Sequence, residues 1–392
     1  MIIEEAKRLK KLPVYVFARL DELKEIERKK GADLIDLGMG NPDVPPPAGV
    51  IKKIKEAVDD PEVSRYPLSQ GAEDFRTAVS KWVKKQYQLN ISPQDEVATL
   101  IGSKEGLIHF SFAFVDAGDL VMYVEPAYPA HFNATILSGG TPFAMPTTSK
   151  DSYLPDFDKI SAEDFKKTKI MVLSYPTNPT AAFAPREIFE KAVSLAKKYN
   201  FILLHDFAYA EIYFDGNKPI SCLSIPGAKE VCIEFHSLSK TFGMAGWRCG
   251  FAVGNESLIK TLRRIKTNLD YGLFRGVQIA AIEALSTPKE YIDNTRATYQ
   301  KRRDIFVEGI NSLGSKVEKP KGSMYVWIPV PRGTDSTKFS IEVLGKTGIV
   351  LSPGTAFGAL GEGYVRAALV TSDARIKEAI DRLKKANIRF DA

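Results

Sequence analysis

The chain has 392 residues, of which 44% are hydrophobic and 26% are charged. These fractions are typical of globular proteins and exclude a wholly disordered, collagenous or coiled-coil protein. The net charge of +6 is small for this length, and the basic clusters alternate with apolar residues. The charge therefore indicates solvated helix faces and no nucleic-acid or membrane surface.

The three cysteines, Cys222, Cys232 and Cys249, form no CxxC pair. We expect neither a disulfide framework nor a metal site from them, and the low count favours a reducing compartment. The N-terminal letters MIIEEAK lack the layout of a signal peptide, and no stretch is long and apolar enough to span a bilayer. The expected location is the cytoplasm.

Taken in chain order, the sequence changes texture three times. Residues 1–30 are typical of an N-terminal arm with charged helical pieces, and residues 31–47 are rich in Gly and Pro and predict a loop. Apolar runs then alternate with helical patterns. Strands are expected at 96–102, 120–124, 170–174, 201–204, 231–235 and 249–253, and helices at 104–115 and 185–199.

This alternation favours an α/β fold with a mostly parallel sheet covered on both faces. After residue 268 a long helical stretch runs through 278–285 to 310, and strand-like pieces follow at 324–328 and 363–369. These features predict a smaller α+β domain. Polar clusters follow several of the expected strands, where such sheets bind ligands.

One of these clusters, at 237–248, reads SLSKTFGMAGWR. Lys240 is placed to act as a nucleophilic amine, which can form a Schiff base with an aldehyde cofactor. Arg248 and the serines could hold a phosphate, and the glycines allow a close approach of backbone to ligand. A second candidate phosphate turn, Gly102-Ser103-Lys104, opens an expected helix. It lacks the spacing of a Walker A loop, so an ATPase is not expected.

The string at 237–248 resembles the signature of the class I and II, fold-type I, pyridoxal-phosphate aminotransferases. The strings MGNPD at 39–43, IGSKEGL at 101–107 and DYG at 270–272 are similar to those of alanine-forming (glutamate–pyruvate) transaminases and LL-diaminopimelate aminotransferases. The resemblance covers essentially the whole chain. It implies a homodimer with shared active sites and a large cofactor domain at 48–285 around a mostly parallel seven-stranded sheet. A small α+β domain would follow at 286–392, and residues 1–47 would supply the arm and part of the small domain.

The resemblance also implies roles for particular residues. Lys240 would hold the cofactor and move the substrate proton, Asp206 would face the pyridine nitrogen, and Tyr209 would bond the cofactor O3′ together with Asn178. The implied cofactor-binding set comprises Gly102, Ser103, Lys104, Tyr128, Asn178, Asp206, Tyr209, Ser237, Ser239, Lys240, Arg248 and, from the neighbouring subunit, Tyr66. The implied substrate-binding set comprises Gly40, Asn178, Arg366 and, across the subunits, Tyr15.

Transfer of an amino group between an L-amino acid and a 2-oxo acid by a ping-pong mechanism is the implied reaction, with glutamate as donor and the alanine type favoured. Aspartate and LL-diaminopimelate aminotransferases stay open, as do a C–S lyase and a cyclopropane-carboxylate synthase on the same fold. Lys266 or Arg275 could bind a side-chain carboxylate. A regulatory protein is disfavoured because we expect no helix-turn-helix segment before the arm.

Overall fold

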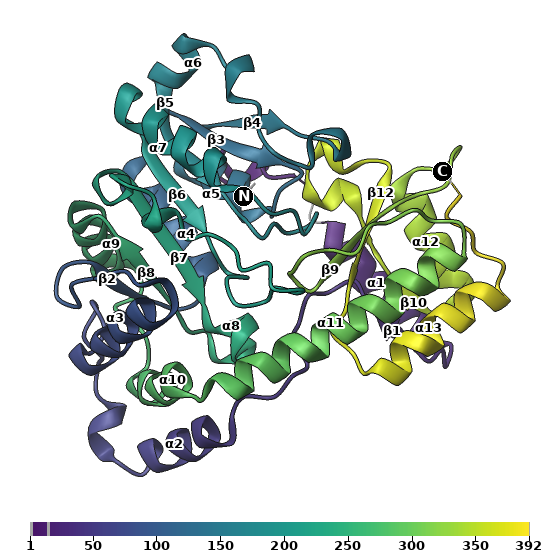
Figure 1. Ribbon diagram of the computed structural model, residues 1–392, viewed down its shortest axis with the longest axis horizontal. Coiled ribbons are helices and arrows are strands. Elements are labelled where there is room, and N and C mark those ends of the chain that lie inside the picture. The colour runs from purple at the N-terminus through teal and green to yellow at the C-terminus, as the bar shows by residue number, and fades with distance from the viewer. Residues whose placement is uncertain (1–2, 14–15, 392) are drawn as a thin grey trace.

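The computed structural model describes residues 3–13 and 16–391. Figure 1 shows two lobes, one built around a large sheet and one around small sheets, with the long helix α11 (Lys289–Ser312) running between them. The site lies where the two lobes meet.

The large sheet has seven strands in the order β2-β8-β7-β6-β5-β3-β4. Only β8 runs antiparallel to its neighbours, so the prediction of a mostly parallel sheet is confirmed. The strands are β2 (Val97–Leu100), β3 (Leu120–Glu125), β4 (Thr141–Pro146), β5 (Thr168–Leu173), β6 (Ile202–Asp206), β7 (Cys232–Ser237) and β8 (Gly250–Gly254).

Both faces of this sheet are covered by helices, which explains why its central strands are almost continuously apolar. The largest core cluster and a second cluster occupy the two faces, with Phe189 and Met171 in one and Ile170 and Leu204 in the other. Strand β4 was not predicted from the sequence. It is the edge strand, and most of its side chains are only half-buried, so it lacks the apolar run that identified its neighbours.

The helices begin and end close to the predicted positions. They are α1 (Val16–Lys29), α2 (Ala48–Val58), α3 (Glu73–Tyr87), α4 (Ser103–Phe114), α5 (Ala130–Ser138), α6 (Ala162–Lys167), α7 (Arg186–Tyr199), α8 (Leu238–Thr241), α9 (Glu256–Leu269), α10 (Arg275–Ser286), α11, α12 (Ser336–Thr347) and α13 (Asp373–Lys385). The single helical stretch predicted through 278–310 is two helices. Thr287 and Pro288 separate them, because proline cannot continue the hydrogen-bond ladder of α10.

The second lobe holds the three-stranded antiparallel sheet β11-β12-β9, formed by β11 (Ser352–Pro353), β12 (Tyr364–Ala368) and β9 (Tyr325–Pro329). A short parallel pair joins β1 (Ile35–Asp36) to β10 (Ile349–Val350). Residues 31–47 are therefore not only a loop. Ile35 and Leu37 are buried in the core of this lobe, which a search for turn residues does not detect.

The lobes have separate hydrophobic cores, and the core of the smaller lobe combines residues 35–37 with residues from 306 onward. The division at residues 47 and 285 stays a prediction. Among the described residues, no helix combines the length and apolarity needed to cross a membrane.

Candidate active site

A pocket of about 240 Å³ lies at the carboxyl ends of β5, β6 and β7, between the amino end of α4 and strands β9 and β12. Twelve of the predicted site residues line it: Gly40, Ser103, Lys104, Tyr128, Asn178, Asp206, Tyr209, Ser237, Ser239, Lys240, Arg248 and Arg366. The fold thus assembles side chains from positions up to 326 residues apart in one cavity, as expected where parallel strands end.

Lys240 projects from α8, the one-turn helix that follows β7. Its Nζ donates to the Gly40 carbonyl at 2.7 Å. Desolvation is the main cause of a lowered Lys240 pKa, and the cations Arg366 and Arg248 lower the pKa further, against the opposing effect of Tyr325. A smaller protonated fraction leaves this amine more available as a nucleophile or base.

Asp206 ends β6 and is 5% exposed. One carboxylate oxygen, Oδ2, lies 2.9 Å from His131 Nε2. The other, Oδ1, is buried and has no hydrogen-bond partner among the described residues. A buried acceptor without a partner is costly, and the N–H of a protonated ring nitrogen would satisfy it. This wall of the pocket therefore fits a pyridinium ring.

His131 was missed by the sequence analysis. It lies in the first turn of α5, three residues after Tyr128, and the two rings meet edge to face with centroids 5.8 Å apart. A lone histidine in an apolar helix gives no signal of this role, because its partner Asp206 is 75 residues away.

The amino end of α4 and Arg248 form the anion-binding side of the pocket. A Cβ placed on Gly102 would lie 2.4 Å from Arg248 Nη2, so only glycine allows this arginine to reach the turn. Gly102 does not itself line the cavity, yet its missing side chain shapes it. Ser237 caps α8 by accepting from the Ser239 N–H at 3.2 Å. Free N–H groups, hydroxyls and a guanidinium together fit a phosphate.

Arg366 points into the pocket from β12 and is 3% exposed. It donates to Asn178 Oδ1 at 2.8 Å and to the Gly38 carbonyl, and its Nε is buried without a partner among the described residues. The printed ion pairs give it no carboxylate. A planar guanidinium held this way is suited to a ligand carboxylate.

The structure answers the question of the two other cations. Lys266 is fully buried and donates to Glu105 at 2.9 Å and to Asp270 at 2.7 Å. Arg275 lies on a separate groove between α3 and α10, where it makes a bidentate pair with Asp74 at 2.9 and 2.6 Å. Neither cation is available to a substrate carboxylate in this pocket.

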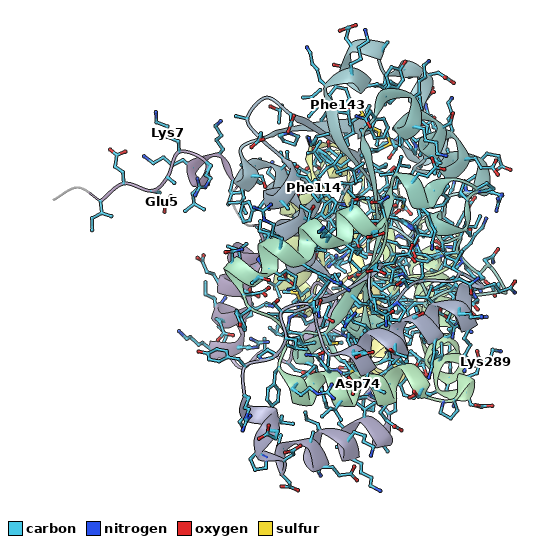
Figure 2. The ribbon with its side chains drawn as sticks, turned by 90° about the vertical axis from the view of Figure 1, so that its left-hand side faces the viewer. Glu5, Lys7, Asp74, Phe114, Phe143 and Lys289 are labelled. Atoms are coloured by element: carbon cyan, nitrogen blue, oxygen red, sulfur yellow. The ribbon has the colours of Figure 1, made fainter. Side chains whose placement is uncertain are left out.

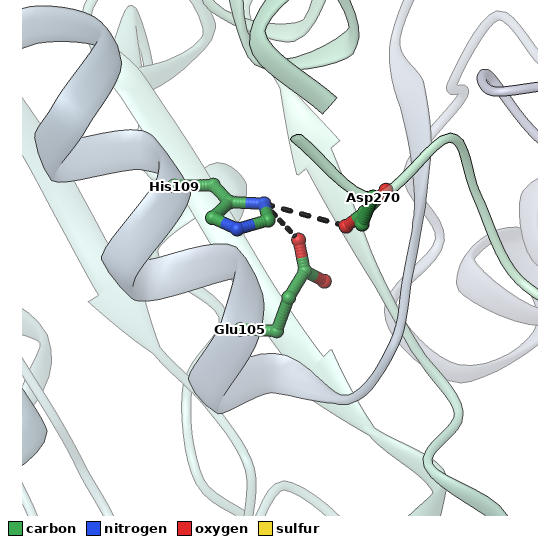
Figure 3. A group of neighbouring side chains, drawn as sticks. All are labelled: Glu105, His109 and Asp270. Atoms are coloured by element: carbon green, nitrogen blue, oxygen red, sulfur yellow. Dashed lines mark ion pairs between the residues drawn. The ribbon is translucent and has the colours of Figure 1, made fainter. Parts of the chain in front are cut away.

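Glu105, His109 and Asp270 form the one group of possible metal ligands among the described residues (Figure 3). The ammonium of Lys266 contacts both carboxylates of this group. Because that ammonium already supplies the positive charge, the group is a buried ion-pair cluster and gives no support for a metal centre.

Two predicted residues are not brought to the pocket. Tyr66 is 90% exposed, and its ring meets that of Tyr271 edge to face at 5.6 Å. Tyr15 lies outside the described residues. Tyr325, in contrast, lines the pocket although the sequence analysis gave it no role.

A family model described as aminotransferase class I and II matches residues 32–383. This chain belongs to that family. The aminotransferase is 46% identical over 386 residues to an LL-diaminopimelate aminotransferase 2 of Nostoc sp., covering 98% of this chain and 99% of the relative. It is 44% identical to the LL-diaminopimelate aminotransferase of Halothermothrix orenii, covering 99% and 100%.

Among solved structures, the aminotransferase is similar to substrate-bound BacF from Bacillus subtilis, with a TM-score of 0.96, 35% identity and full coverage of both chains. These likenesses confirm the fold-type I architecture and the transaminase activity expected from the sequence. LL-diaminopimelate aminotransferases were among the relatives that the sequence motifs indicated. Enzymes of this family use pyridoxal 5′-phosphate.

Proposed function

We propose that this aminotransferase holds pyridoxal 5′-phosphate covalently on Lys240 and transfers the amino group of an amino acid that carries a second carboxylate. The carrying observation is the orphaned Oδ1 of Asp206 opposite a desolvated lysine amine in one cavity. The phosphate would lie at the α4 turn with Ser103, Ser237, Ser239 and Arg248, and the ring between Asp206 and Tyr128. Tyr209 and Asn178 would face O3′.

When bound, the cofactor supplies an aldehyde carbon for amine exchange and a protonated ring that withdraws electrons from the substrate α-carbon. Arg366 would bind the α-carboxylate in a bidentate manner, with the backbone at Gly40 and Asn178 beside it. Once free, the Lys240 amine would take the proton from the substrate α-carbon and deliver it to the other reacting carbon. Its lowered pKa favours this because only a neutral amine can accept a proton.

The charge of the pocket supports a substrate with two carboxylates. Lys104, Arg248 and Arg366 line the pocket without a carboxylate partner among the described residues, and the carboxylate of Asp206 already contacts His131. Arg248 would be taken by phosphate and Arg366 by the α-carboxylate. Lys104, exposed at the pocket edge, is left for a second substrate carboxylate.

LL-Diaminopimelate, named for the relatives, has such a distal carboxylate, and so does glutamate. Alanine lacks it and would leave Lys104 without a partner. We therefore propose LL-diaminopimelate as one substrate and glutamate as the other amino acid of the pair, ahead of the alanine type that the sequence motifs favoured.

We also propose a homodimer with shared sites. Five large apolar side chains are exposed along 66–68 and 269–274: Tyr66, Leu68, Leu269, Tyr271 and Phe274. Residues 3–11 are exposed as well, and Figure 2 shows the segment that carries Glu5 and Lys7 extending away from the body. An exposed apolar patch and a projecting arm fit a second copy of the chain. Tyr66 would then reach the partner's pocket. The three free, buried cysteines fit a cytoplasmic location.

Absorbance spectroscopy tests the cofactor proposal. Purified chain mixed with pyridoxal phosphate is expected to develop a visible band that survives gel filtration. Lys240→Ala should lose the band, whereas Lys316→Ala, which removes an exposed lysine of the small lobe, should keep it. A stable band of normal position in Lys240→Ala would contradict the assignment.

A further inference from the structure

Tyr325 begins β9 in the small lobe, and its side chain is 3% exposed. Its hydroxyl oxygen lies 2.8 Å from that of Tyr209 in the large lobe, and the two rings meet edge to face with centroids 5.6 Å apart. A single hydrogen bond between two phenols therefore joins the lobes at the pocket.

The second neighbour of Tyr325 is Arg366. Ala368 of β12 lies opposite Tyr325 in the sheet register, so Arg366, two residues earlier, is a diagonal neighbour on the same face. Its guanidinium carbon lies 4.2 Å from the centre of the Tyr325 ring. This cation–π contact holds the ring against the group that we expect to bind the substrate carboxylate.

The third neighbour is Lys240, across the backbone of Gly40. The Gly40 carbonyl accepts a hydrogen bond from Lys240 Nζ. A Cβ at Gly40 would lie 2.1 Å from the Tyr325 hydroxyl oxygen, so no residue with a side chain fits between them. The phenol and the amine thus face one another across a glycine, close enough for each to change the charge of the other.

The pKa directions agree with this geometry. Burial raises the pKa of Tyr209 well above its ordinary range, and the charge of Tyr325 adds to the effect. Burial also acts to raise the pKa of Tyr325, but the charges of Lys240 and Arg366 and the Tyr209 hydrogen bond outweigh it, and the net pKa falls. Tyr209 therefore keeps its proton and donates to Tyr325.

On the basis of the function proposed above, we propose that Tyr325 is a positioning residue of this active site. Its hydroxyl holds the Tyr209 hydroxyl in place and offsets, beside Lys240, the positive charge of Arg366 and Arg248. Tyr325 and Arg366 reach the amine from β9 and β12, Tyr209 from the segment after β6, and Arg248 from the segment before β8. Without the Tyr325 oxygen, the amine should lose its proton at a lower pH.

The test compares Tyr325→Phe with Tyr299→Phe in the full-length, cofactor-free chain. Tyr299 belongs to the same buried aromatic cluster, lies outside the pocket lining and has a hydroxyl without a hydrogen-bond partner among the described residues. Both changes remove one buried oxygen. The measured quantity is the pH midpoint of the rate at which the visible band forms after mixing with pyridoxal phosphate, because only the neutral amine reacts.

For Tyr325→Phe we expect the midpoint to fall by about one pH unit, which corresponds to a tenfold change in the ionisation constant. Tyr299→Phe should keep the wild-type midpoint. Equal midpoints in the two variants would overturn the role of Tyr325. A wild-type chain that never forms the band would instead contradict the proposed function. Thermal melting of both variants checks that each is folded.

Discussion

At the scale of single residues, the site depends on side chains whose polar atoms the protein leaves unmatched. Asp206 offers a buried oxygen without a partner, and Arg366 and Lys104 offer positive charge without a carboxylate. Each mismatch identifies the charge of the missing ligand group. The three predictions of residue identity that follow from the sequence motifs alone could not assign these partners.

Asp206→Asn should retain cofactor binding but lose most of the reaction rate. A neutral amide stabilises a protonated ring nitrogen poorly, and the loss of one oriented electrostatic group costs about 10²–10³ in rate. Single-turnover kinetics with glutamate measure the effect. Asp381→Asn, on an exposed position of α13, is the control. A rate near that of the wild type would show that another group faces the ring nitrogen.

Lys104→Ala should discriminate between substrates. It removes the cation that we assign to the distal carboxylate but leaves the backbone N–H groups of the α4 turn. We expect KM for LL-diaminopimelate to rise about tenfold, the effect of a lost charge-assisted hydrogen bond of roughly 1.5 kcal/mol, with KM for alanine unchanged. Lys316→Ala is again the matched surface control. An equal rise for both amino acids would argue against a second carboxylate at Lys104.

The sequence motifs predicted most of the pocket because each motif follows a strand, and parallel strands end at one edge of the sheet. They did not predict His131 or Tyr325. Each of these depends on a partner far along the chain, Asp206 for one and Tyr209 for the other. For Lys266 the motifs left open a substrate contact, and only burial beside Glu105 and Asp270 shows that its charge is already neutralised.

At the scale of elements, the cluster in Figure 3 ties α4 to α9 and to the segment that follows α9. Glu105 accepts from the Ile101 N–H at 2.8 Å as well as from Lys266 and His109, so the cluster also braces the predicted phosphate turn. Asp270 accepts from the Gly272 N–H at 3.0 Å beside the exposed ring of Tyr271. The cluster thus connects the cofactor side of α4 to the apolar patch.

This cluster should make stability depend on pH. Burial acts to raise the Glu105 pKa, but the His109 hydrogen bond and the charge of Lys266 lower it from 4.5 to about 2. A pKa depressed on folding contributes stability above the unfolded value, and this stability is lost as pH falls from about 5 towards 2. Chemical unfolding at stepped pH should show this loss in the wild type and a smaller loss in Glu105→Gln. Parallel curves would contradict the pairing.

Lys266→Met should be more damaging than either pH change, because it leaves two buried carboxylates without their cation. The expected loss in unfolding free energy is about 3–5 kcal/mol. Lys260→Met on the exposed face of α9 is the control for helix propensity. Comparable stability of the two variants would mean that Lys266 is not the partner of Glu105 and Asp270.

The elements themselves show why prediction succeeded in some places and failed in others. Buried strands such as β5 and β6 are short apolar runs, and these were found. Edge strand β4 is half-exposed and was missed, and β1 is only two residues long inside a Gly- and Pro-rich segment. Pro288 ends one helix and begins the next, which an apolar periodicity continuing across it concealed.

At the scale of the whole molecule, the proposed dimer depends on the apolar patch around Tyr66 and Tyr271. Tyr271→Asp should place a charge in that patch and shift sedimentation towards a monomer, with loss of activity because the sites are shared. Ile341→Asp, which charges an exposed apolar position on α12, should leave the assembly unchanged. A fully active Tyr271→Asp monomer would contradict shared sites.

The central claim is that this pocket accepts an amino group from an amino acid with two carboxylate groups. The most direct measurement adds single amino acids, without any oxo acid, to the cofactor-loaded enzyme and follows the visible band by stopped flow. The account predicts rapid conversion to the amine form of the cofactor with LL-diaminopimelate and glutamate, and slow conversion with alanine. Conversion by alanine alone would contradict the role given to Lys104, and release of ammonia without formation of the amine form would contradict transamination.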